Sequence, residues 1–103
     1  MAQIEILSEE ESGSGWRFDL QALEADGRLT RFEIRLSWAD YNHWSPDGGD
    51  APAAVAEAAL RCLLEQPELR AVMPASFDAA SLRRRLPNAD ELIRQRIDRP
   101  GLG

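Results

Sequence analysis

Hydrophobic and polar residues alternate along three stretches in the first part of the chain. Ile4 and Ile6 alternate with polar neighbours, and the same two-residue period runs through residues 16–24 and 28–36. Such alternation is typical of β-strands that bury one face. We therefore predict strands near residues 3–7, 16–24 and 28–36.

The turn between the second and third stretches decides how they pair. A two-residue loop at Asp26-Gly27 puts the apolar residues of the two strands on opposite faces, whereas a three-residue loop over 25–27 puts them on one face. Gly27 suits the left-handed position of the longer loop. We therefore expect the register that pairs Trp16 with Leu36, Phe18 with Ile34 and Leu20 with Phe32.

After residue 36 the hydrophobic period lengthens, which indicates helices. Ser37, with an aspartate three residues later, is typical of a helix N-terminus. Phe77, Asp78 and Leu82 have the spacing of a hydrophobic staple around an Asp N-cap, and Pro67 marks a helix end. These signals predict helices near residues 38–44, 51–66, 78–86 and 89–98.

Two segments carry no regular pattern. Residues 8–15 hold three consecutive acids with two glycines, and we expect a flexible acidic loop there. Residues 99–103 are expected to be a frayed tail. An antiparallel three-stranded sheet with one apolar face must be covered, and the helix near 51–66 is the obvious cover. The expected fold is a two-layer α+β domain that spans residues 1–103.

A set of short motifs is spread along most of the chain. These motifs are Gly15-Trp16-Arg17-Phe18, Asp26-Gly27, Leu36-Ser37, Asp40-Tyr41, Leu63-Leu64-Glu65, Phe77-Asp78, Leu82 and Leu86-Pro87. Together they resemble a family of small uncharacterised bacterial proteins of about one hundred residues. The resemblance covers most of residues 3–97 and implies one compact domain. It implies no activity, cofactor or catalytic residue.

Composition removes several kinds of chemistry. The chain has one cysteine and one histidine, so it cannot build a metal site from these residues or a disulfide framework, and we expect no cofactor. Cys62 falls on the apolar face of a predicted helix, where it acts as a small hydrophobic residue.

An enzyme that uses carboxylates with His43 is the weakest hypothesis, so we expect a non-enzymatic protein. No apolar run is long enough to span a membrane, and one unpaired cysteine fits a cytoplasmic location.

An aromatic segment is the most interesting surface candidate. Three large aromatic residues fall within seven positions, too many for a short helix to bury easily. Either Trp38 and Tyr41 belong to the core with Trp44 as a lid, or the segment is an exposed anchor for a protein partner. The candidate partner-binding residues are Trp38, Tyr41, His43 and Trp44.

The net charge of −6 is unevenly distributed. Residues 1–50 hold eleven acids and four arginines, whereas residues 79–103 hold three acids and six arginines. We therefore expect an interaction or regulatory module that binds a basic protein, or self-associates through open sheet edges. The alternative is nucleic-acid binding, although these arginines lack the neighbouring aromatic residues of a typical footprint. The residues of this alternative are Arg83, Arg84, Arg85, Arg94 and Arg96.

Overall fold

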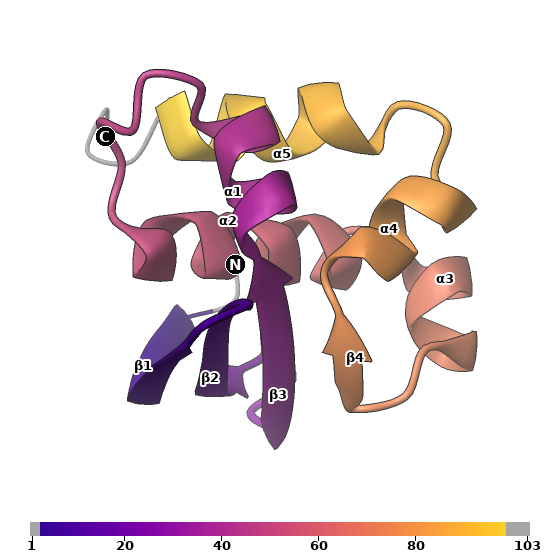
Figure 1. Ribbon diagram of the computed structural model, residues 1–103. Coiled ribbons are helices and arrows are strands. Elements are labelled where there is room, and N and C mark those ends of the chain that lie inside the picture. The colour runs from indigo at the N-terminus through magenta and orange to yellow at the C-terminus, as the bar shows by residue number, and fades with distance from the viewer. Residues whose placement is uncertain (1–2, 99–103) are drawn as a thin grey trace.

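The computed structural model describes residues 3–98, which form a four-stranded sheet packed against helices (Figure 1). The predicted α+β class is confirmed. The strand order is β1-β2-β3-β4, with antiparallel pairing except between β3 and β4. The elements along the chain are β1 (Gln3–Ser12), β2 (Gly15–Leu23), β3 (Leu29–Ser37), α1 (Trp38–Trp44), α2 (Pro52–Leu64), α3 (Pro67–Val72), β4 (Ser76–Asp78), α4 (Ala80–Arg85) and α5 (Ala89–Asp98).

The β2–β3 hairpin has the predicted register. Glu24 N donates to Arg28 O at 2.9 Å around the three-residue loop, and Gly27 has a φ of 88°. Only glycine adopts such a conformation without strain, which is why the loop closes at this position. The observed pairs include Trp16 with Leu36, Phe18 with Ile34 and Leu20 with Phe32, and all six side chains are buried.

The first strand is longer than predicted. β1 continues to Ser12, which pairs with Gly15, so the expected flexible loop over residues 8–15 is wrong. Every side chain from Leu7 to Ser12 is exposed. Because β1 is an edge strand, pairing with β2 satisfies its backbone on one side and the acidic side chains stay in water. The missing alternation therefore concealed a strand.

A β-bulge interrupts β1 at Leu7. Ile6 pairs with Leu20, but the next residue of β2, Asp19, pairs with Ser8. Leu7 is therefore the extra residue between two regular stretches of pairing. A bulge of this kind bends the edge strand and increases its twist.

A fourth strand corrects the predicted three-stranded antiparallel sheet. β4 pairs in parallel with β3, and its central residue Phe77 is buried opposite Ile34. Asp78 does not cap a helix: its carboxylate accepts a hydrogen bond from Arg35 Nε at 2.8 Å, and Ala79 is the N-cap of α4. A strand of three residues is too short to show a hydrophobic period, so the staple pattern was read as part of a helix.

The described residues contain five helices, one more than the four predicted. The additional helix is α3. Pro67 occupies the first turn of α3, where its missing N–H costs nothing. Arg70 fixes α3 to the sheet by donating to the Glu24 carboxylate, and its guanidinium lies 5.9 Å from the centre of the Phe32 ring. The hydrogen bonds from Arg70, helped by one from Thr30, outweigh desolvation and lower the pKa of Glu24.

The long helix α2 lies between the sheet and α5, so the helical layer is two helices deep at this point (Figure 1). Alanines on its buried face let its backbone approach the sheet closely. Ile93 and Ile97 of α5 are also buried and join the same hydrophobic cluster. The predicted frayed tail, 99–103, lies outside the described residues. The buried residues of α2 are Val55, Ala56, Ala58, Ala59, Leu60, Cys62 and Leu63.

Replacement of Gly15 by alanine should destabilise the protein severely. Gly15 has a φ of 147°, and a Cβ atom there would overlap the backbone oxygen of Leu36 on the neighbouring strand. We expect Gly15→Ala to lower the free energy of unfolding by at least about 2 kcal/mol in urea denaturation. Gly13→Ala is the matched control, because a Cβ atom there meets nothing within 4 Å. Equal stability of the two variants would contradict this account.

Candidate functional site

The aromatic segment divides into buried and exposed side chains. Trp44 and Tyr41 are 2% and 8% exposed, whereas Trp38 is 41% exposed. His43 lies between these extremes. This arrangement is the reverse of a core Trp38 with a covering Trp44. Trp38 is therefore the aromatic residue of the segment that a partner could contact.

A polar cluster gathers around Asp90 at the start of α5. Trp44 Nε1 donates to Asp90 Oδ1 at 2.7 Å, and His43 Nε2 lies 2.8 Å from Asp90 Oδ2. Arg83 Nε lies 2.9 Å from Asp90 Oδ1, and a second nitrogen of Arg83 lies 3.2 Å from Oδ1 of the buried Asp40. One carboxylate thus joins α1, α4 and α5.

The protonation of this cluster follows from its contacts. Burial raises the pKa of Asp90, but hydrogen bonds from Trp44 and His43 and the charge of Arg83 lower it by more. The net pKa lies below the usual value, so the ionised carboxylate can only accept and His43 Nε2 must carry a proton. Arg83 Nη2 lies 3.4 Å from that nitrogen, but both groups donate, so this contact is not a hydrogen bond.

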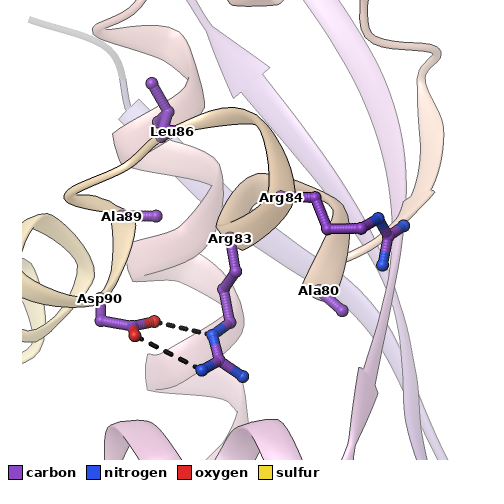
Figure 2. A pocket seen from close by; sticks show the side chains of 6 residues that line it. All are labelled: Ala80, Arg83, Arg84, Leu86, Ala89 and Asp90. Carbon is purple, nitrogen blue, oxygen red and sulfur yellow. Dashed lines mark hydrogen bonds and ion pairs between the residues drawn. The ribbon is translucent and has the colours of Figure 1, made fainter.

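A pocket of about 290 Å³ lies beside the cluster, between α4 and the start of α5. Figure 2 shows that Arg83 points toward Asp90 and that Arg84 extends away from it. Because two carboxylates already hold Arg83, its guanidinium is poorly placed to bind an incoming anion. A histidine oriented by a carboxylate can act as a base, but here Trp44 and Arg83 share that carboxylate. We interpret the cluster as a connection between helices.

The remaining arginines of the nucleic-acid alternative have separate contacts. Arg94 donates to the backbone oxygen of His43 at 2.9 Å, and Arg96 Nε donates to Glu65 at 2.7 Å. Arg84 donates to a serine of its own helix, and Arg85 is exposed. Carboxylates therefore compensate two of the five candidate arginines, Arg83 and Arg96.

The acidic half of β1 is exposed along its whole length. β1 occupies an edge, and residues 8–12 include three glutamates and no base. Beyond the bulge, Glu9 pairs with Phe18 and Glu11 pairs with Trp16, so both acids project from the face that carries the core. Within residues 3–98, neither Glu9 nor Glu11 has a recorded ion pair, whereas Glu10 pairs with an arginine of β2.

Trp38 lies next to this acidic stretch. Its ring centre is 4.3 Å from that of Trp16, which is the β2 partner of Glu11. Its backbone N–H donates to Ser14 O at 3.2 Å, so the start of α1 is attached to the β1–β2 turn. The structure thus brings together an open edge, free carboxylates and an exposed indole.

Other chemistry is restricted in the described residues. Cys62 is fully buried, and desolvation raises the pKa of its thiol. Residues 3–98 contain no group of three potential metal ligands, and no described helix is both long and apolar enough to cross a membrane.

Comparison with known proteins does not narrow the function. No protein-family model matches the chain, and no curated protein or solved structure matches it. The resemblance to small bacterial proteins of about one hundred residues therefore stays a prediction.

Sequence reasoning missed two parts of these sites. Glu9 and Glu11 were assigned to a loop, although the alternation of Ile4 and Ile6 marked the start of their strand. Asp90 was not singled out, because the residues that bind it lie up to 47 positions away along the chain. The predicted helix near residues 89–98 accounted for its neighbourhood and gave no reason to look for distant partners.

The Asp90 cluster should contribute to stability in a pH-dependent way. Asp90→Asn keeps an acceptor for Trp44 but directs an amide donor at His43 or Arg83. We expect a loss of about 1–2 kcal/mol at neutral pH, a modest value because a third of the carboxylate side chain is exposed to screening solvent. The measurement is urea denaturation across a pH series.

A lowered pKa stabilises the folded state above the ordinary carboxylate pKa, and this stabilisation disappears as pH falls through the lowered value. The stability difference between wild type and Asp90→Asn should therefore shrink in acid. Glu91→Gln, at an exposed neighbour on α5, is the control and should have little effect. A difference that stays constant from neutral to acidic pH contradicts the assignment.

Proposed function

We propose that the protein is a non-enzymatic interaction module that binds a positively charged, extended segment of a partner protein along β1. The observation that carries this proposal is an edge strand whose outer half bears uncompensated carboxylates. An edge strand presents unpaired backbone donors and acceptors, to which an extended peptide can add as a further strand. Charge then decides which peptides can approach.

The charge of β1 favours a basic partner over a second copy of the chain. Residues 3–12 contain four glutamates and no arginine. Two copies that paired through β1 would bring eight carboxylates together, and like charges facing each other across strands are destabilising. A basic strand gains attraction from the same side chains. We therefore prefer a basic protein partner to a homodimer formed through this edge.

The second sheet edge is less suitable for strand addition. β4 has only three residues, and its neighbour across the sheet is β3. Asp78 and Ser76 of this edge also bind Arg35. A short strand offers few hydrogen bonds to a partner, whereas β1 offers the five residues 8–12 beyond its bulge alone.

Two further parts of the proposal come from the sequence. A bacterial cytoplasmic setting fits the use of twelve arginines with no lysine and the single cysteine. Nucleic-acid binding through Arg83, Arg84, Arg85, Arg94 and Arg96 stays the alternative, although contacts with Asp40, Asp90 and Glu65 reduce the free positive charge of these residues.

The proposal predicts binding of a short peptide in which arginine alternates with valine. A peptide with citrulline in place of arginine has nearly the same shape without the charge, and should bind at least about five-fold more weakly. Binding should also weaken between about 20 mM and about 500 mM salt, because exposed charges are screened. Calorimetric titration of the intact protein measures each affinity.

Two comparisons separate strand addition from simple charge attraction. An arginine–valine peptide methylated on alternate backbone nitrogens keeps its charge but cannot form the ladder, so its binding should be lost. Glu9→Gln with Glu11→Gln should weaken binding about five-fold, whereas Glu68→Gln with Glu91→Gln, at exposed sites elsewhere, should not. Equal binding of the methylated peptide, or of the Glu9 and Glu11 double variant, would falsify the proposal.

A further inference from the structure

The exposure of Trp38 is unusual for a residue with so many fixed contacts. Its ring packs against Trp16 at 4.3 Å between centres and stands edge-on to Tyr41 at 6.5 Å, yet Trp38 is 41% exposed. The Ser37 side chain caps the helix that begins at Trp38, and the Trp38 N–H is bonded to Ser14. The indole is therefore an exposed ring held on a rigid support.

The strand register brings a carboxylate to the same side of the sheet. Glu11 is the direct β1 partner of Trp16, and directly paired residues of antiparallel strands project from one face about 5 Å apart. Trp38 packs on Trp16 from that face. Glu11 and Trp38 thus flank Trp16, with Glu9 two residues along the same face.

We infer that Trp38 and Glu11 together bind an arginine or lysine side chain of the segment that adds to β1. This inference rests on the proposed function and names the side chain that the site selects. A cation binds favourably over the face of an indole, and a guanidinium can stack on the ring while it donates to a carboxylate. Arginine is favoured over lysine for that reason.

The charge of the surroundings excludes other occupants of this position. An acidic side chain would be repelled by Glu9 and Glu11. An apolar side chain would cover part of Trp38 but would leave the Glu11 carboxylate, which the register places opposite Trp16, without a partner. A basic side chain satisfies both the ring and the carboxylate.

The test compares variants of Trp38 in the intact protein, with the arginine–valine and citrulline–valine peptides as probes. Trp38→Leu keeps an apolar contact with Trp16 but removes the aromatic face. It should weaken binding of the arginine peptide about five-fold and leave the citrulline peptide nearly unchanged. Trp38→Phe keeps a smaller aromatic ring and should cause an intermediate loss of affinity for the arginine peptide. This variant keeps the test valid if Trp38→Leu fails to fold.

A double-mutant cycle between Trp38→Leu and Glu11→Gln tests whether the two residues act on the same cation. If they do, their effects on arginine-peptide binding should not add. Leu29→Ala is the control, because Leu29 is an exposed apolar residue at the far end of β3. It should leave both affinities unchanged.

The possible results distinguish this inference from the proposal on which it rests. If wild-type protein binds neither peptide, the proposed function fails and the cation site fails with it. If Trp38→Leu binds the arginine peptide as wild type does, the cation site is wrong while strand addition stands. Equal losses for the arginine and citrulline peptides also overturn the inference, because Trp38 would then act only as an apolar contact.

Discussion

The pairing of β2 with β3 around Gly27 puts six large apolar side chains on one face of the sheet, and water must be excluded from that face. α2 provides the cover, and α5 packs on the other side of α2 (Figure 1). Because β3 leads directly into α1 at Trp38, the same register also decides where α1 begins. The exposed indole at the end of β3 is thus a consequence of how the core is closed.

The protein uses its charges in two different ways. Around Asp90, acids and bases from separate helices face one another and also bind the polar edges of His43 and Trp44. Such contacts hold helices together because each charge is compensated within the fold. Along β1, Glu9 and Glu11 have no such compensation in the described part of the chain. The overall charge of −6 is therefore made up of two kinds of region: the Asp90 cluster, where charges compensate one another, and β1, where exposed acids do not.

The parts of the fold that sequence predicted are those with a local physical signal. The period of two in residues 16–24 and 28–36, with Gly27 between them, was enough to fix the hairpin register. The second half of β1 had no alternation because neither of its faces is buried, and β4 was too short to show any. Pro67 starts α3, but the same residue also fits the end of the preceding helix, and the contact that attaches α3 to the hairpin, Arg70 with Glu24 46 residues away, leaves no local trace. The Asp90 cluster escaped prediction for the same reason. Local sequence patterns do not show which polar residues meet across long distances in the chain.

If β1 binds an extended partner as proposed, the bulge at Leu7 sets the length of the sequence that it can recognise. It bends the edge between its two regular stretches, so a straight partner strand has only residues 8–12 along which to run. Five residues of extended chain span about 17 Å, and alternate side chains share a face. A partner would therefore need only two or three suitably spaced basic residues. A motif this short can occur in many unrelated proteins, so a single bend in the backbone sets how selective the edge can be.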